Sequence, residues 1–165
     1  MEDLVAVRGY ITEDHATLDD ALRRLDLPKL KELDAYIRVA TYGLIQLPAY
    51  RGPVFRGTDL SDEAIAKYVP GALIREHAFV CTSANIGFRF PGNATFVIDS
   101  INGRDVSALA ENPSEREVVF FTGTHFSVLA VDGAPQQRKI YLREIPDPRL
   151  RKDAATKRSA PPGGG

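Results

Sequence analysis

Residues 44–60, "LIQLPAYRGPVFRGTDL", mark the point at which the residue pattern of the chain changes. Before them, apolar residues recur every three or four positions, which is typical of amphipathic helices. After them come short runs rich in β-branched and aromatic residues, which are typical of strands. Pro48 lies at the change and ends the helical part, because proline cannot continue a helix. Helices followed mainly by strands favour an α+β domain.

Two helices can be delimited within residues 1–48, which we interpret as helical. The first covers "TLDDALRRL" (17–25), where Thr17 is a candidate N-cap followed by acidic residues in the first turn. The second covers "LPKLKELDAYIRVATYGLIQLP" (27–48), with Pro28 near its start. Its apolar stripe consists of Leu30, Leu33, Ile37 and Ala40.

The part after residue 50 predicts strands and one more helix. The strand-like runs are "PVFRG", "AFVCTS", "ATFVID", "EVVFF", "HFSVLAV" and "RKIYLREI", separated by turn residues such as "PGN", "NG" and "DG". The stretch "SDEAIAKYV" (61–69) indicates a short helix capped by Ser61. From residue 147 the chain is basic and then rich in Pro and Gly. We therefore expect one domain over 1–146 and a disordered tail over 147–165.

The composition fits one globular domain. Hydrophobic residues make up 44% of the 165 residues, enough for a single core. The net charge of -1 argues against a general nucleic-acid surface. No apolar run reaches the roughly 20 residues that span a bilayer, and the N-terminus does not resemble a signal peptide. The single cysteine, Cys81, excludes an internal disulfide, and the scattered His15, His77 and His125 form no metal motif.

Two carboxylates precede a run of large apolar residues in "SEREVVFF" (114–121). Alternate side chains of a strand share a face, so Glu115 and Glu117 are expected on one face and Arg116 on the other. Residues 118–121 would continue this alternation. A carboxylate at the start of a buried strand needs a cation, a donor or water. From this pattern alone, a solvated strand end and a pair of acids that stabilise a cationic transition state both remain open.

Two other stretches place polar residues in strands that should be buried. In "YRGPVFRGTDL" the guanidinium of Arg56 suits phosphate oxygens, and the adjacent Gly57 lets a ligand approach the backbone. In "EHAFVCTSAN" three small polar residues, Cys81, Thr82 and Ser83, follow an apolar start. Small hydroxyl side chains can hold sugar hydroxyls or orient a carboxylate. Taken singly, these stretches also fit a paired core arginine and a polar strand end.

In this order the three stretches resemble the arginine–serine–glutamate class of mono-ADP-ribosyltransferases, which includes bacterial toxins and vertebrate ecto-enzymes. The resemblance is carried by residues 44–60, by "PGALIREHAFVCTSAN" (70–85) and by "VSALAENPSEREVVFFTGTHFSVLAV" (106–131). A lone Glu-x-Glu carries no information, whereas three blocks in order are specific. The resemblance implies an α+β domain in which N-terminal helices precede two small, mainly antiparallel sheets around an NAD-binding cleft.

The resemblance also implies a role for each site residue. Glu117 matches the catalytic glutamate, which stabilises the cation that forms as nicotinamide leaves. Glu115 matches the glutamate that accompanies arginine acceptors, and Arg56 would hold the NAD+ phosphates. No metal is implied. The implied NAD-binding residues are Arg56, Gly57, Cys81, Thr82, Ser83, Phe90 and Glu117, with Phe88 as the alternative to Phe90 for the aromatic residue that stacks on nicotinamide.

Three features depart from the family pattern. Cys81 replaces the first serine of the usual triplet, which orients the catalytic glutamate, and a thiol is a weaker hydrogen-bond partner. Asn112 stands where many relatives have an aromatic residue in the substrate loop. The N-terminal helical part is short, which suggests either missing contacts to the adenine end of NAD+ or a module cut from a larger protein.

The resemblance predicts a mono-ADP-ribosyltransferase that cleaves NAD+ and modifies an acceptor, with protein arginine favoured over RNA. It further implies a toxin or effector that is secreted or delivered into a target cell and acts in its cytoplasm, with an immunity or carrier protein as a possible partner. Two alternatives remain open. One is an NAD+ glycohydrolase, with water as the acceptor, and the other is a non-catalytic binding module, which Cys81 would favour.

Overall fold

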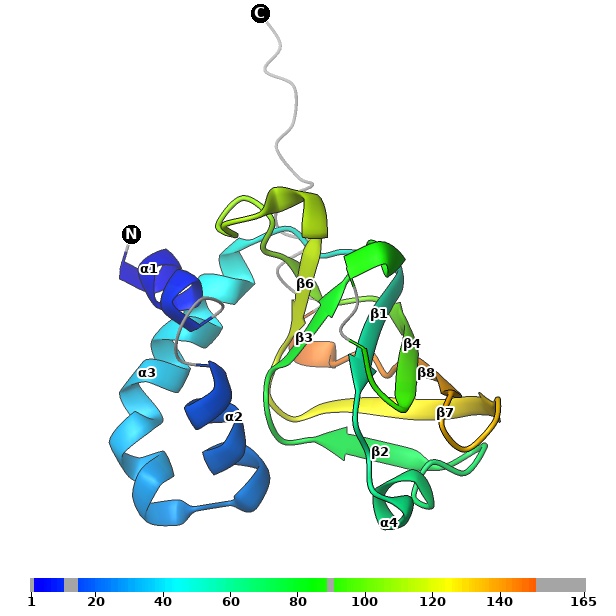
Figure 1. Cartoon of the computed structure of the whole chain (residues 1–165). Helices are drawn as coiled ribbons and strands as arrows, with labels where there is room; N and C mark the ends of the chain where they lie inside the picture. The colour runs from blue at the N-terminus through cyan, green and yellow to red at the C-terminus, as the bar shows by residue number, and fades with distance from the viewer. Residues whose placement is uncertain (1, 11–14, 89–90, 151–165) are drawn as a thin grey trace, which may run out of the picture.

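The computed structural model of the chain describes residues 2–10, 15–88 and 91–150. Three N-terminal helices precede an eight-stranded sheet, and short helices lie in the connections between strands (Figure 1). The α+β class is thereby confirmed. The elements are α1 (Glu2–Gly9), α2 (His15–Arg24), α3 (Leu27–Gln46), β1 (Gly52–Thr58), α4 (Asp62–Ile65), β2 (Leu73–Glu76), β3 (Val80–Ser83), η2 (Ile86–Phe88), β4 (Ala94–Ser100), β5 (Arg104–Asp105), η3 (Pro113–Glu115), β6 (Glu117–Phe120), β7 (Thr124–Asp132) and β8 (Arg138–Glu144).

The helices form largely where the sequence predicts them. Asp26 caps α3 by accepting a hydrogen bond from Lys29 N at 3.2 Å, and the following first turn carries the expected proline. Ser61 caps α4 in the same way. One expectation is wrong: α2 begins at His15, so Thr17 lies inside the helix and is not its N-cap. Within the described residues, no helix combines the length and the apolar character needed to cross a membrane.

The eight strands form one hydrogen-bonded sheet in the order β2-β7-β8-β4-β1-β3-β6-β5. Strands β4 and β8 are parallel, and the other neighbouring pairs are antiparallel. The sheet is narrow at one place, because β1 pairs with β3 only at Phe55–Ser83, whereas seven residue pairs join β1 to β4. Figure 1 shows β3 and β6 running in a different direction from β2 and β7. Instead of the two small sheets expected, the structure has one mixed sheet whose two parts meet at this junction.

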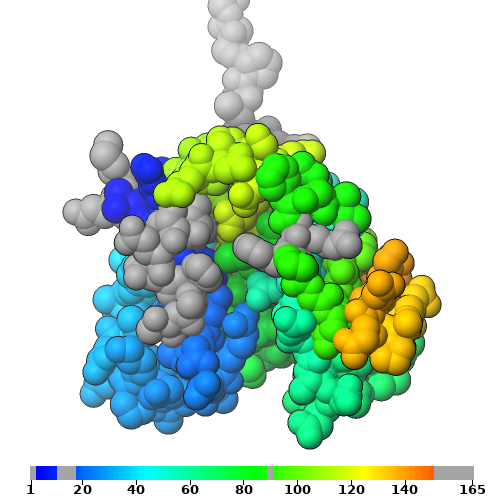
Figure 2. Space-filling model, viewed as in Figure 1, coloured from blue at the N-terminus to red at the C-terminus, as the bar shows by residue number. Residues whose placement is uncertain are grey.

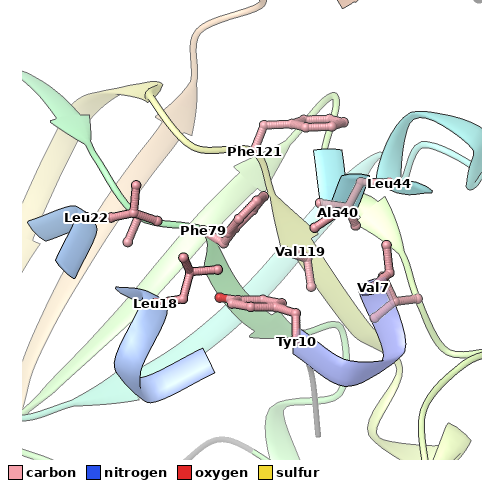
Figure 3. Packing of buried hydrophobic residues seen from close by; sticks show 11 residues of the cluster. Val7, Tyr10, Leu18, Leu22, Ala40, Leu44, Phe79, Val119 and Phe121 are labelled. Carbon is pink, nitrogen blue, oxygen red and sulfur yellow. The ribbon is translucent and has the colours of Figure 1, made fainter. Parts of the chain in front are cut away.

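Strand β6 lies between two hydrophobic clusters, which explains its unbroken run of apolar residues. Val119 and the following Phe121 pack with the three N-terminal helices (Figure 3). Val118 and Phe120 belong to the opposite cluster, which is formed mainly by β1, β4, β7 and β8. The predicted alternation of residues 118–121 is confirmed. Because both faces of β6 are packed, the position of Glu117 at its start is fixed.

The chain after β8 remains in contact with the domain up to the last described residue. Ile145 N donates to His125 O at 2.8 Å, and residues 148–150 form a helical turn. Leu150 packs against the cluster on the helical side. The predicted tail begins at residue 147, so its first four residues belong to the described structure and residues 151–165 lie outside it.

Candidate active site

The two glutamates of "SEREVVFF" line one pocket, but strand alternation does not bring them there. Glu117 is the first residue of β6, whereas Glu115 ends the short helix η3. Between them, Arg116 has the left-handed backbone angles φ 49° and ψ 55°, which are uncommon for a residue other than glycine. The expectation that residues 115–117 form a strand is therefore wrong. The tight turn at Arg116 is what places Glu115 beside Glu117.

Asn112 and the end of β3 hold the turn that presents Glu115. The Asn112 side chain accepts a hydrogen bond from Ser114 N at 3.2 Å and donates to Glu115 Oε1 at 3.4 Å. The Ser83 hydroxyl donates to the backbone oxygen of Glu115, and Asn85 Nδ2 donates to Ser114 O at 3.4 Å. Asn112, which replaces an aromatic residue of the family pattern, thus has a positioning role in this loop.

The pocket around the glutamates has a volume of about 50 Å³ and lies where β1, β3 and β6 meet. All three stretches singled out in the sequence contribute to it. Its lining consists of Phe55, Arg56, Cys81, Thr82, Ser83, Phe88, Glu115 and Glu117. Phe88, on η2, is 42% exposed and offers an aromatic ring at the rim. Phe90, the first choice for the stacking aromatic residue, lies outside the described residues.

A second pocket lies next to the first, and Arg56 lines both. It has a volume of about 270 Å³, close to the lower end of ordinary ligand pockets of about 300–1,000 Å³. Arg23 of α2 and Tyr68 both line it, and Arg23 Nε is 3.6 Å from Glu76 Oε1. A furrow separates the helices from the strand-rich half on the surface (Figure 2). Because it lines both pockets, Arg56 is in reach of a ligand in either one.

A larger cavity lies elsewhere, beside the chain that follows β8. It measures about 510 Å³, and its ionisable lining residues are Arg75, His125, Glu144, Asp147 and Arg149. We prefer the pocket of about 50 Å³ around the glutamates as the reaction site. Of the three pockets described, it is the one that combines two carboxylates, an arginine and the polar end of β3.

The carboxyl group of Glu117 is strongly affected by its surroundings. Burial, and then the nearby charge of Glu115, raise its pKa from 4.5 to about 7, while a hydrogen bond from Cys81 acts in the opposite direction. A carboxyl group with a pKa near neutrality, in a pocket with a charged partner, is typical of functional sites. The negative charge of Glu117 is therefore unfavourable in the free protein, and a bound cation would stabilise it.

Arg56 points its guanidinium to the junction of the two pockets. Its Nη1 donates to the backbone oxygen of Cys81 at 3.2 Å, which fixes one end of the group. No ion pair joins Arg56 to an acid among the described residues. A guanidinium has five N–H donors, so most remain available to an anion. The adjacent Gly57 is buried opposite Thr95 and does not line either pocket.

The polar residues of β3 have different partners. The Thr82 hydroxyl is buried and donates to Val118 O at 2.7 Å, so it ties β3 to β6. Ser83 supports the Glu115 loop, as described above. Cys81 faces the same pocket as Glu117 and contacts the N-terminal helices, where its Sγ lies 3.6 Å from Tyr10 Oη. How these residues contact a ligand remains a prediction.

Two further residues beside the pocket were not predicted from the sequence. Tyr10 follows α1, is 1% exposed and donates to both carboxyl oxygens of Asp19 at 3.0 Å. Asp19, on α2, is 5% exposed. A usable signal existed, because Asp19 lies next to Leu18 and three residues before Leu22, on the apolar face of its helix. Over residues 2–10, 15–88 and 91–150, no group of three His, Cys, Asp or Glu side chains could hold a metal ion.

Known proteins similar in sequence include arginine ADP-ribosyltransferases. No protein-family model matches the chain. The candidate NAD(+)–arginine ADP-ribosyltransferase Mav of Mycobacterium avium (strain 104) is 35% identical over 150 residues, which are 87% of this chain and 18% of Mav. The NAD(+)–protein-arginine ADP-ribosyltransferase Tre1 of Pseudomonas putida (strain GB-1) is 32% identical over 147 residues, which are 88% of this chain and 29% of Tre1. The chain thus spans less than a third of either relative.

Solved structures show the same fold. The type III effector XopAI of Xanthomonas axonopodis pv. citri matches with a TM-score of 0.75 and 27% identity, over 87% of this chain and 66% of the XopAI chain. The ADP-ribosyltransferase Vis of Vibrio splendidus, in complex with agmatine, matches with a TM-score of 0.76 and 22% identity, over 87% of this chain and 74% of the Vis chain. The chain is therefore a homologue of the mono-ADP-ribosyltransferases of the bacterial toxin type and has their fold.

Proposed function

We propose that the chain is the catalytic domain of a mono-ADP-ribosyltransferase. It cleaves the nicotinamide–ribose bond of NAD+ and transfers ADP-ribose to an arginine side chain of an acceptor protein. The observation that carries this proposal is the convergence of Glu117, Glu115 and Arg56 on one pocket, next to a second pocket that Arg56 also lines. A dinucleotide that reacts through a cationic transition state needs an anion at the reacting carbon and a cation at its phosphates.

Glu117 stabilises the positive charge that develops during cleavage. As the C1′–N bond breaks, nicotinamide leaves with the electron pair, and the ribose carbon becomes an oxocarbenium-like cation. The Glu117 carboxylate accepts a hydrogen bond from a ribose hydroxyl and stabilises this cation. Because its pKa is about 7, Glu117 is ionised in only part of the free molecules near neutral pH. The positively charged nicotinamide ring of NAD+ favours the ionised form.

Glu115 and Arg56 position the two reactants. A carboxylate at Glu115 can pair with the acceptor guanidinium and direct one of its nitrogens at C1′. The new N–C1′ bond forms as this nitrogen attacks, and its proton passes to Glu115 or to solvent. Arg56 offers its remaining N–H donors to the pyrophosphate.

We further propose that the domain acts as a toxin or effector inside a target cell. Support comes from XopAI, a type III effector with a similar structure. An immunity or carrier protein is a further partner that would fit this mode of action. Since the chain spans less than a third of Mav and Tre1, these proposals concern the domain and not the whole of a longer protein.

Incubation of the purified chain with NAD+ labelled in the adenine ring, with agmatine as acceptor, tests the proposal. Agmatine carries a guanidinium and binds Vis, so it is a suitable small acceptor. We expect release of nicotinamide and formation of ADP-ribosyl-agmatine, detected by mass spectrometry, and neither product with Glu117→Gln. Free ADP-ribose without an adduct would identify a glycohydrolase. No nicotinamide release at any concentration of folded protein would overturn catalysis and leave a binding module.

A further inference from the structure

The Cys81 thiol lies between two groups that can accept its single proton. On one side it lies beside the Glu117 carboxyl group, which lines the same small pocket and whose pKa is lowered by the thiol. On the other, its Sγ lies 3.6 Å from Tyr10 Oη, which in turn donates to Asp19. Glu117 is therefore connected to Asp19 of α2 through two intervening side chains. We refer to Glu117, Cys81, Tyr10 and Asp19 as the hydrogen-bond chain.

The hydrogen-bond chain is closed to solvent on the helical side. Tyr10 packs among the apolar residues of the helix-side cluster, with Leu18, Phe79 and Val119 near its ring (Figure 3). Burial raises the pKa of the Cys81 thiol to about 12 and also raises the pKa of Tyr10. Both groups therefore keep their protons over the usable pH range, and each can donate in only one direction at a time.

The ionisation of Glu117 decides how the protons of the chain are arranged. When Glu117 is ionised, the thiol proton points to its carboxylate, because hydrogen bonds to charged acceptors are stronger than those to neutral ones. When Glu117 is protonated, it can donate to Sγ, and the thiol can then donate to Tyr10. All donors then point from Glu117 towards the Asp19 carboxyl group. The link to Tyr10 and Asp19 thus favours the protonated form of Glu117.

We propose that Tyr10 and Asp19 are positioning residues of the catalytic pocket, which set the direction of the Cys81 proton and thereby the hydrogen bonding of Glu117. This inference rests on the proposed function, because that function gives Glu117 its role. Other ionisable groups also face this part of the site. They are Glu115 on η3 and Arg56 on β1, and both line the same pocket.

A titration of the Glu117 carboxyl group by ¹³C NMR, without NAD+, tests the chain directly. Tyr10→Phe removes the competing acceptor, so the thiol donates to Glu117 alone, and the midpoint should fall by about half to one pH unit. Cys81→Ala removes the donor, and the midpoint should rise by a similar amount. Tyr36→Phe is the matched control, because its hydroxyl donates to Ala6 O at 3.1 Å between α3 and α1. Its midpoint should equal that of the wild type.

The pH profile of kcat for nicotinamide release provides the second readout. The acid limb of this profile should move in the same direction as the NMR midpoint of each variant. In the Tyr10 and Asp19 variants KM for NAD+ should change less than about twofold, because neither residue lines the two pockets. Asp19→Asn keeps the shape of the side chain and removes its charge. It should lower the midpoint as Tyr10→Phe does, and it replaces that variant if Tyr10→Phe does not fold.

Two results would overturn the inference. One is an unchanged midpoint in Tyr10→Phe and Asp19→Asn, even where the rate falls, because these residues would then act only by stabilising the helices. The other is a shift of Tyr10→Phe and Cys81→Ala in the same direction. A wild-type protein that releases no nicotinamide would refute the proposed function instead, and the NMR midpoints would still decide whether the hydrogen-bond chain acts on Glu117.

Discussion

Replacing Glu117 by Gln is expected to stabilise the fold at alkaline pH while abolishing nicotinamide release. The pKa of Glu117 is raised from 4.5 to about 7 in the folded protein. Between these two values the folded protein holds a proton that the unfolded chain has already released. The free energy of unfolding therefore falls as pH rises through this window. Well below pH 4.5 both states are protonated, and the penalty disappears.

The size of the effect follows from the difference between the two pKa values. At about 1.36 kcal/mol per pH unit, the change from 4.5 to about 7 corresponds to an upper limit of about 3.4 kcal/mol. Glu117 is only half-buried, so solvent screening reduces this, and we expect about 1–2 kcal/mol. In a domain of this size, that gain corresponds to a rise in Tm of about 3–6 °C at pH 9.

Urea denaturation of the wild type and of Glu117→Gln at pH 4.5, 7 and 9 measures this directly. The advantage of the variant should be small at pH 4.5, should appear mostly by pH 7 and should then level off. Glu111→Gln is the matched control, because Glu111 is exposed and its replacement removes the same charge outside the pocket. A constant difference between pH 4.5 and 9, or a less stable variant at pH 9, would refute the view that Glu117 ionises unfavourably.

Three other substitutions separate the roles of the pocket residues. Glu115→Gln should impair transfer to agmatine more than nicotinamide release, because the proposed role of Glu115 is to hold the acceptor guanidinium. Equal losses would contradict that role. Arg56→Lys keeps the positive charge but removes the planar guanidinium, which can bind phosphate oxygens through two N–H groups at once. KM for NAD+ should therefore rise about tenfold or more, with a smaller effect on kcat. An unchanged KM would remove Arg56 from the NAD+ site. Cys81→Ser should preserve or increase the rate of nicotinamide release, and a large decrease would show that the thiol does more than donate a hydrogen bond.

Most of the fold could be predicted from the sequence, because its longer elements have clear periodicity. Strands β2 and β5 could not. β5 has two residues, and β2 reads "LIRE" with an exposed Leu73, so neither shows the alternation of a buried strand. The single sheet was also beyond local patterns. The sheet continues from β1 to β3 through the single pair Phe55–Ser83. These residues are far apart in the sequence, so local patterns do not predict their pairing.

The residues of the candidate site were easier to predict than their geometry. Arg56, Cys81 and Glu117 line one pocket together, as their resemblance to the family suggested. Glu115 does lie beside Glu117, but the expected reason is wrong. Residues two apart in a strand share a face, yet Glu115 lies in η3 and outside the strand that Glu117 begins. The left-handed turn at Arg116 depends instead on hydrogen bonds from Asn112 and Ser83, and no pattern in "SEREVVFF" encodes these partners.

The distance between Cys81 and Tyr10 explains why a thiol is suited to this position. An Sγ–Oη separation of 3.6 Å is within reach of sulfur, whereas O–H···O hydrogen bonds are about 2.5–3.0 Å long. A serine hydroxyl at residue 81 would be too far from Tyr10 and would be left to donate to Glu117. The cysteine therefore connects the helical part of the domain to the Glu117 carboxyl group, and a serine would break this connection. In the proposed hydrogen-bond chain the thiol donates in a direction that depends on the charge of Glu117. A serine at residue 81 would donate to Glu117 alone.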